Sequence, residues 1–190
     1  MADMQTRPKT ALILVDVINS FFEPRHPNYY PGVTDVLGPM RQMRAKARET
    51  GAVVVHAVER HRKGFDDHEW RRLPVHHIEG ADDADFFEEF SPEGENETLV
   101  LKRRFSAFFA TDLALFLQEQ GVTRIIIAGV KTNVCIRATA QDGFANGFDI
   151  VIAREATNSN RPHLAEASLE DIDRYMGRVV PLSEALEMLE

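Results

Sequence analysis

The chain contains one cysteine, Cys135, in a local sequence that can make a thiol reactive. Three consecutive isoleucines, Ile125 to Ile127, lie upstream of it and are followed by Gly129, which predicts a short strand buried on both faces. Thr132 and Asn133 are helix-capping residue types, so Cys135 falls in or near the first turn of a following helix. The unpaired amides and the positive dipole end at that position favour an anion. We therefore expect the thiol to ionise more readily than a free cysteine and to act as a nucleophile.

Two further residues that can do chemistry follow predicted strands. Asp16 ends the apolar run 10–15, and Lys102 ends the run 98–101. Taken singly, such an aspartate is usually a turn residue, such a lysine a solvated charge and a lone cysteine a core residue. Ligands of open α/β sheets bind at the carboxyl ends of the strands, so these three residues converge on one sheet edge. That convergence predicts an active site.

The elements that position these residues follow from the alternation of short apolar runs with helical patterns. The runs predict strands over 10–16, 52–58, 98–102, 124–130, 148–153 and 178–180. Helical spacing and capping signals predict helices over 33–50, 108–120, 135–146, 163–175 and 183–189, the last with Ser183 as its N-cap. Residues 59–94 are crowded with charges, histidines and breaks, and are predicted to form a long functional loop. The expected fold is a three-layer α/β/α, Rossmann-like arrangement with a six-stranded, mainly parallel sheet.

Composition narrows the class of protein. A chain of 190 residues with 44% hydrophobic residues is expected to form a single domain over residues 1–190 with a substantial core. The net charge of −8 argues against binding nucleic acid or an anionic membrane, and no apolar run is long enough to span a bilayer. One cysteine excludes an intramolecular disulfide, so we expect a cytoplasmic protein.

Three sequence blocks, Leu14 to Phe22, Lys102 to Phe108 and Gly129 to Ala140, carry a resemblance over nearly the whole chain. The chain resembles the isochorismatase-like cysteine hydrolases, which include nicotinamidases, N-carbamoylsarcosine amidases, ureidoacrylate hydrolases and biuret hydrolases. The resemblance implies a catalytic triad and a cis peptide bond before a non-proline residue. By motif matching, the triad is Asp16, Lys102 and Cys135, and the cis bond joins Val130 to Lys131. The resemblance also implies a homodimer or homotetramer.

The implied chemistry is physically consistent with these residues. A thiolate attacks an amide carbonyl, and Asp16 takes the thiol proton and returns it to the leaving amine. Lys102 holds both groups by its charge, and the backbone amides of Lys131 and Cys135 form the oxyanion hole. The sister isochorismatases hydrolyse a vinyl ether without the cysteine, so Cys135 favours C–N cleavage. The predicted activity is that of a cysteine amidohydrolase acting on a small linear amide, ureido or carbamoyl compound and releasing ammonia or an amine.

Candidate substrate-binding residues come from three segments near the triad. Aromatic side chains can form walls, Asn19 can orient an amide, and Arg60 with His61 can bind a carboxylate. The candidates are Asn19, Phe21, Phe22, Arg60, His61 and Phe108. Lys131 occupies a position that is more often small in the family, and its side chain faces either the pocket or a subunit contact.

A metal site is the main alternative suggested by the residues after the second strand. Glu59-Arg60-His61 imitates the Asp-x-His of the metal-dependent nicotinamidases, with His68, His76 and His77 nearby. Glutamate is longer than aspartate, however, and Arg62 stands where a proline is expected, so we expect no metal and no cofactor. His76 and His77 are then expected to be a surface pair. A metal-dependent nicotinamidase-like amidase and a non-enzymatic binding protein on the same fold remain the alternatives.

Overall fold

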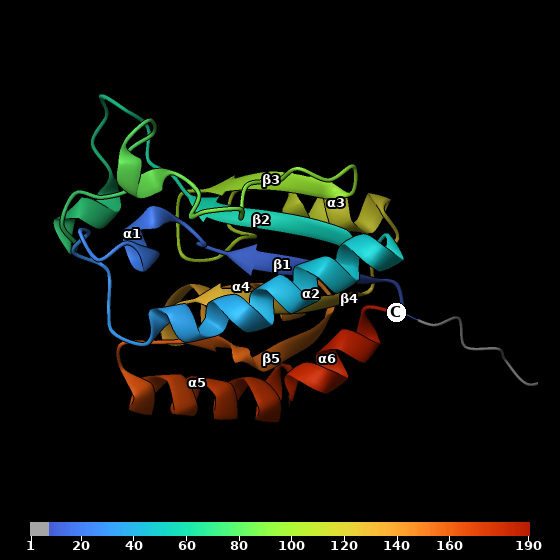
Figure 1. The fold of residues 1–190 in the computed structure, drawn as a ribbon. Helices are drawn as coiled ribbons and strands as arrows, with labels where there is room; N and C mark the ends of the chain where they lie inside the picture. The colour runs from blue at the N-terminus through green and yellow to red at the C-terminus, as the bar shows by residue number, and fades with distance from the viewer. Residues whose placement is uncertain (1–7) are drawn as a thin grey trace, which may run out of the picture.

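All six strands of the central sheet run parallel, as the alternation of buried runs and helical patterns predicts. The structure, a computed structural model, describes residues 8–190. The strand order is β3-β2-β1-β4-β5-β6 (Figure 1). The strands are β1 (Thr10–Val15), β2 (Val53–Glu59), β3 (Glu97–Lys102), β4 (Arg124–Val130), β5 (Asp149–Asn158) and β6 (Gly177–Val180). The predicted fold class is confirmed.

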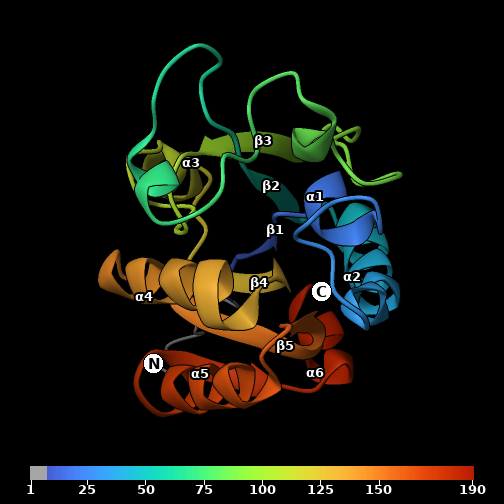
Figure 2. The same cartoon turned by 90° about the vertical axis from the view of Figure 1, so that its left-hand side faces the viewer.

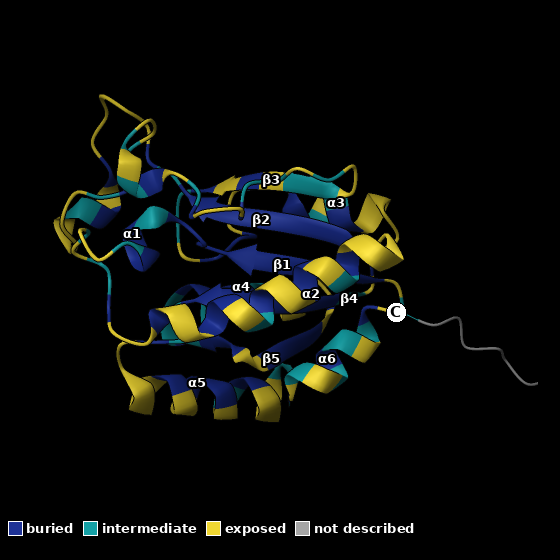
Figure 3. Cartoon of the chain, in the orientation of Figure 1, coloured by how far each residue is buried: buried dark blue, intermediate teal, exposed yellow. Residues whose placement is uncertain are grey.

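Helices cover both faces of this sheet and make the three layers (Figure 2). The helices are α1 (Asn19–Phe22), α2 (Leu37–Thr50), α3 (Leu113–Glu119), α4 (Arg137–Ala145), α5 (Pro162–Tyr175) and α6 (Leu182–Met188). Helices α2 and α6 bury their apolar side chains on one face of the sheet, and α3, α4 and α5 bury theirs on the other. Along β1, Leu12 and Leu14 enter the first core while Ile13 and Val15 enter the second, because successive side chains of a strand point to opposite faces. The inward faces of α2 and α5 are buried and their outward faces are exposed (Figure 3).

This connectivity brings the carboxyl ends of all strands to one edge. Asp16 follows β1, Lys102 ends β3, and Cys135 lies in the turn after β4. Strand β5 is longer than predicted. Beyond Ala153 it continues to Asn158, and its Thr157 and Asn158 pair with Gly129 and Val130 after a bulge in the β4–β5 register.

The helix predicted over 108–120 begins only at Leu113. Ala110 has a left-handed backbone with φ 55°, which a continuous right-handed helix does not allow. Phe108 is buried before this break, with its ring stacked on Phe148. The helix predicted over 33–50 is also divided, into a 3₁₀ turn at Val33–Val36 and then α2.

Two capping predictions are wrong. No side chain caps the π-helical turn Thr132–Ile136 that follows β4, because Thr132 hydrogen-bonds Thr157 and Asn133 accepts a bond from Ser159. Ser183 is not the N-cap of α6. That helix begins after Pro181, and the backbone N–H of Leu182 donates to the Glu155 carboxylate at 2.8 Å instead.

The segment between β2 and β3 contains two short 3₁₀ turns, His68–Arg71 and Asp82–Ala84, within irregular loops. These loops project beyond the strand ends, next to α1 (Figures 1 and 2). Within residues 8–190 there is no helix with both the length and the apolar character needed to cross a bilayer.

Candidate active site

Three strand ends bring Asp16, Lys102 and Cys135 together. The Lys102 ammonium lies 2.8 Å from Oδ2 of Asp16 and 3.7 Å from Sγ of Cys135. Asp16 and Lys102 are fully buried, and Cys135 is only 5% exposed. Asp16 has a left-handed backbone with φ 54°, which ends β1 and turns its side chain into the site, where Oδ1 accepts the Glu59 N–H at 2.8 Å. The predicted triad therefore forms one contact group.

The charges of this group control the protonation of the thiol. Burial raises the pKa of Cys135; Lys102 opposes that increase, while the carboxylates of Asp16 and Glu59 add to it. The thiol pKa is therefore well above its usual range, contrary to the expectation from its place in a helical first turn, because burial outweighs the turn dipole. A thiol that keeps its proton needs a base. Asp16 hydrogen-bonds the thiol, and its Oδ2, which lies 2.8 Å from the Lys102 ammonium, is the carboxylate oxygen that can take this proton.

Lys102 carries a stable positive charge at the centre of the group. Burial lowers its pKa, but Asp16, Cys135 and Glu59 together raise the pKa above the ordinary lysine value. Its ammonium also donates to the carbonyl of Arg104 at 3.3 Å and lies 4.0 Å from Oε1 of Glu59. The buried cation thus has partners on several sides, which a buried charge requires.

Glu59 links the triad to two histidines. Its Oε2 lies 3.0 Å from Nδ1 of His77 and 3.5 Å from Nε2 of His76. Burial raises the pKa of Glu59, but Lys102 and the two histidines outweigh it and lower the pKa, so the carboxylate stays ionised. Nε2 of His77 lies 2.8 Å from the hydroxyl of Ser20. His77 is buried and His76 half-buried, so the prediction that they form a surface pair is wrong.

A cavity of about 350 Å³ opens onto the thiol, a volume suited to a small ligand. Cys135, Lys131 and Val134 form one wall, Phe21 and Ser20 of α1 form another, and Glu59, His76 and His77 line the polar side. The remaining lining comes from the loops, as Pro27, Asn28, Leu73, Pro74, Val75, Asp83 and Phe105. The arrangement can hold a small acyl compound against a buried thiol.

The predicted substrate-binding residues do not all line the cavity. Phe21 lines the cavity, whereas Phe22 is only 2% exposed and stacks on Phe87 in the core. Phe108 is likewise a core residue, on the opposite face of the sheet. The Asn19 amide donates to the carbonyl of Asp82 at 3.1 Å. Consecutive aromatic residues on a short helix point in different directions, which is why only one of the pair reaches the cavity.

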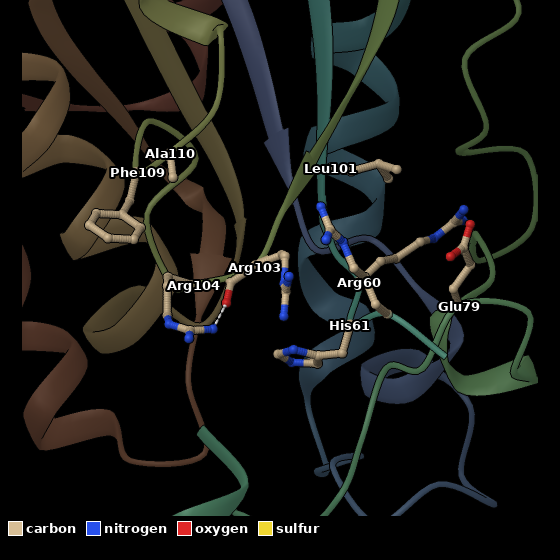
Figure 4. A pocket seen from close by; sticks show the side chains of 9 residues that line it. Arg60, His61, Glu79, Leu101, Arg103, Arg104, Phe109 and Ala110 are labelled. Carbon is tan, nitrogen blue, oxygen red and sulfur yellow. Dashed lines mark hydrogen bonds between the residues drawn. The ribbon is translucent and has the colours of Figure 1, made fainter. Parts of the chain in front are cut away.

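Arg60 lines a second pocket (Figure 4), and Cys135 is not among the lining residues of that pocket. Its guanidinium packs over the ring of Phe86 and donates to the carbonyl of Ala84. Arg103 and Arg104 line the same pocket, but both are paired with Asp67, at 2.8 and 2.9 Å. These arginines are therefore held by partners within the chain, and Arg60 is not positioned to bind a substrate that reacts at Cys135.

His61 is fully buried beside the active site, not exposed to the cavity. It lies 3.0 Å from Asp67 through Nδ1 and 3.7 Å from Glu69 through Nε2. Glu59, His61, Glu69 and His76 each offer one ligand atom, and these four atoms lie within 4.8 Å of one another. Four of the buried ligand atoms have no hydrogen-bond partner among residues 8–190: Oε1 of Glu59, Nε2 of His61 and both oxygens of Glu69. Such a nitrogen and oxygen donor set fits a divalent transition metal, with Asp67 as the outer partner that orients His61.

Sequence reasoning missed Glu69 and Asp67 in this cluster. Burial, together with the nearby Glu59 carboxylate, raises the pKa of Glu69 to about 7. The only available signal was two acidic residues spaced a few positions after Glu59-Arg60-His61, and that spacing alone does not distinguish a ligand from a solvated charge.

The peptide bond between Val130 and Lys131 is cis, at the position that the resemblance indicates. Gly129 before it has φ 119°, and a Cβ there would meet the carbonyl oxygen of Val15 at 2.1 Å. Only glycine allows β4 to approach β1 this closely. This close packing fixes the direction in which the backbone leaves β4 and enters the turn that contains Cys135.

Comparisons with known proteins bear on the family and the fold of the chain. The family model of the isochorismatase domain matches residues 10–184. A maleamate amidohydrolase from Pseudomonas putida is 36% identical over 95% of this chain and 87% of its own. The solved isochorismatase-like hydrolase from Alkaliphilus metalliredigens has a TM-score of 0.88 at 31% identity, covering 96% of this chain and 100% of its own. A pyrazinamidase from Pyrococcus horikoshii, solved in complex with zinc, has a TM-score of 0.82 at 28% identity and covers 92% of this chain and 99% of its own.

Proposed function

The chain belongs to the isochorismatase family, and we propose that Asp16, Lys102 and Cys135 perform the hydrolysis. The protein is an amidohydrolase that cleaves a non-peptide C–N bond of a small linear amide, as its similarity to an amidohydrolase over almost its full length indicates. One observation carries the assignment of the residues. A single buried ammonium contacts both a buried carboxylate and the only thiol of the chain, at the wall of a cavity.

The first half of the reaction forms a thioester. The thiol proton moves to Oδ2 of Asp16 as sulfur bonds to the amide carbon, and the carbonyl electron pair moves onto oxygen. The backbone N–H groups of Lys131 and Cys135 stabilise that oxyanion. As the tetrahedral intermediate collapses, the C–N bond breaks and Asp16 returns the proton to the departing ammonia or amine.

The second half restores the thiol. A water molecule gives a proton to Asp16 and attacks the thioester carbon, and the C–S bond breaks as sulfur regains the proton. Lys102 stays protonated throughout, because its neighbours hold its pKa above the ordinary lysine value. Its charge stabilises the thiolate whenever that forms, at a contact distance of 3.7 Å.

The test is ammonia release from a panel of maleamate, N-carbamoylsarcosine, ureidoacrylate, biuret and nicotinamide. Cys135→Ala is expected to abolish release while the circular dichroism spectrum stays that of the wild type. Gln141→Ala, on the exposed face of the same helical segment, is the matched control and is expected to keep full activity. A folded Cys135→Ala protein that retains turnover would disprove the assignment.

A metal-dependent amidase of the nicotinamidase type is the second candidate, favoured by the donor cluster of Glu59, His61, Glu69 and His76. An ion held by these four side chains would act as a Lewis acid that orients and polarises the substrate. We expect turnover to persist after dialysis against a chelator, as the sequence predicts. Stoichiometric metal in the purified protein, lost together with activity in His61→Ala, would establish this second function instead.

The oligomeric state and the cellular location need separate tests. The homodimer or homotetramer implied by the resemblance is measured by size-exclusion chromatography with light scattering. The cytoplasmic location stays a prediction, and fractionation of the source cells tests it.

A further inference from the structure

The amino group of Lys131 is an isolated cation at the active-site cavity. Lys131 is half-buried and lines the cavity together with Cys135. Its Nζ lies 5.5 Å from the ring centroid of Phe21 and 5.4 Å from that of Tyr30. These cation–π contacts direct the ammonium without neutralising it. The hydroxyl of Tyr30 donates to Oδ1 of Asn158 at 2.8 Å, which fixes the ring beneath the ammonium.

Within residues 8–190, no carboxylate pairs with this ammonium. Burial lowers the pKa of Lys131, and the group that opposes this effect is Cys135 and not a carboxylate. The other two lysines that are not exposed differ, since Lys46 pairs with Glu190 and Lys102 with Asp16. A partly buried cation without an anionic partner is costly to hold, so its site favours a ligand that brings one.

The other charges at the cavity are already engaged. Glu59 contacts Lys102, His76 and His77, and Oδ2 of Asp83 accepts the backbone N–H of His77 at 2.8 Å. The rest of the wall is largely apolar, from Phe21, Leu73, Pro74, Val75, Phe105 and Val134. An anion that enters this cavity therefore meets an available cation in surroundings that strengthen their attraction.

We propose that Lys131 recognises a carboxylate of the substrate, so that the enzyme prefers short amides that carry an acid group, such as the monoamides of dicarboxylic acids. The inference rests on the proposed function and names the substrate class of the same site. Lys131 and Cys135 stand at the two ends of one short turn and line one wall, so a small molecule can place its carboxylate at Nζ and its amide carbon at Sγ. Lys131 takes the role that the sequence assigned to Arg60, which lies at the other pocket.

The test compares two substrates that differ only in charge, maleamate and its diamide, maleamide. Lys131→Met keeps the length and apolar stem of the side chain and removes the charge. We expect kcat/KM for maleamate to fall about 10- to 100-fold, mainly through KM, as for the loss of a charge-assisted contact. The value for maleamide should fall much less than that for maleamate, because any effect on the oxyanion hole, to which Lys131 contributes its backbone N–H, is common to both amides. Lys131→Arg should preserve the preference for the acid.

Lys63→Met is the matched control, because Lys63 is an exposed lysine of the loop after β2 and its replacement removes the same net charge. It should leave the ratio of the two kcat/KM values unchanged. An unchanged ratio in Lys131→Met, or an equal fall for both amides, would overturn the inference while leaving the amidohydrolase assignment intact.

A binding measurement separates the two proposals. In Cys135→Ala, isothermal titration should show maleamate bound at least about tenfold more tightly than maleamide, and this difference should vanish in Cys135→Ala/Lys131→Met. Equal affinities for the acid and the diamide in Cys135→Ala contradict carboxylate recognition, even where Lys131→Met does not fold. Absence of turnover in the wild type with a retained preference in binding would instead contradict the proposed function alone.

Discussion

Asp16→Asn should speed the alkylation of the Cys135 thiol and stop the hydrolysis of the amide substrate. The carboxylate of Asp16 raises the thiol pKa, and in the proposed mechanism it also accepts the thiol proton. Removing its charge should make the thiol more acidic and quicker to react with a small alkylating agent, while hydrolysis of the amide stops. Asparagine suits the site sterically, because it is nearly isosteric with aspartate and tolerates the left-handed backbone of Asp16. Lys102 keeps Glu59 and the carbonyl of Arg104 as partners in this variant.

The contacts of Lys102 set the size of the effect. Its Nζ lies 2.8 Å from Oδ2 of Asp16 and 3.7 Å from Sγ of Cys135, so these two atoms are at most as far apart as the two distances added together. Even at that upper limit of about 6.5 Å, two unit charges interact by about 2.6 kcal/mol at an effective dielectric constant of about 20, so loss of the Asp16 charge lowers the thiol pKa and raises the thiolate fraction accordingly. A more acidic thiolate is also a weaker nucleophile, which removes about half of that gain and leaves a rise of about tenfold in alkylation rate at neutral pH. Loss of the general base should lower ammonia release by at least about 100-fold.

The assay is the second-order rate of labelling by iodoacetamide between pH 6 and pH 10, followed by mass spectrometry, alongside ammonia release on the same samples. The single cysteine makes the label a direct report on Cys135. Asp149→Asn, an exposed aspartate at the opposite end of the sheet, is the matched control and should change neither rate. Slower labelling in Asp16→Asn, or amide turnover within tenfold of the wild type, would refute the reasoning.

Two further predictions concern the stability of the scaffold, measured by urea unfolding. Gly129→Ala should lower the free energy of unfolding by more than about 3 kcal/mol, because the new Cβ meets the Val15 carbonyl oxygen at 2.1 Å. Gly147→Ala, also at positive φ but with nothing within 4 Å among the described residues, should lower it by about 1–2 kcal/mol through backbone strain alone. Equal losses in the two variants would contradict the close approach of β4 to β1. Glu97→Gln should cost about 3–5 kcal/mol at pH 7 because it leaves the buried Arg44 without its 2.8 Å partner, while the exposed Glu49→Gln should have no measurable effect. Burial raises the pKa of Glu97, but Arg44, Arg48 and His56 outweigh this effect and lower the pKa in the folded protein. The stability difference between the wild type and Glu97→Gln is therefore complete above the glutamate pKa of the unfolded chain, about 4.3, and shrinks as the pH falls toward the pKa in the folded protein. A stability difference that grows on acidification would contradict this sign.

The residues of the catalytic edge could be predicted because their positions depend on local patterns. An apolar run of four to seven residues specifies a strand, and the residue that ends it must lie at the sheet edge. Asp16, Lys102 and Cys135 each follow such a run, and their convergence needs no knowledge of the loops. The helix boundaries that were predicted wrongly depend on single residues. Ala110 takes a left-handed backbone that delays α3, and Glu155 reaches across to cap α6, and neither event leaves a sequence signal.

The segment between β2 and β3 could not be predicted, because contacts between distant residues determine its path. Asp67 is held by His61 on one side and by Arg103 and Arg104 on the other. His77 reaches Ser20 of α1, and Asp82 pairs with Arg25. Each contact joins two charged or polar residues that are equally plausible as solvated surface, so composition indicates a functional loop without its arrangement.

Glu59 shows how the sheet itself organises the chemistry. In the order β3-β2-β1-β4, the strand ends present Lys102, Glu59, Asp16 and the turn with Cys135 side by side. Neighbouring strands are held about 4.8 Å apart by their hydrogen bonds, so these side chains are spaced by the backbone and not by loops. Glu59 ends the strand between those of the acid and the lysine, and it connects them to His76 and His77, which the loops contribute. The groups that we propose to react are thus positioned by the strand ends and by the turn after β4, while much of the cavity wall comes from loops and from Lys131. The fold therefore separates these groups from the cavity lining, most of which the loops contribute.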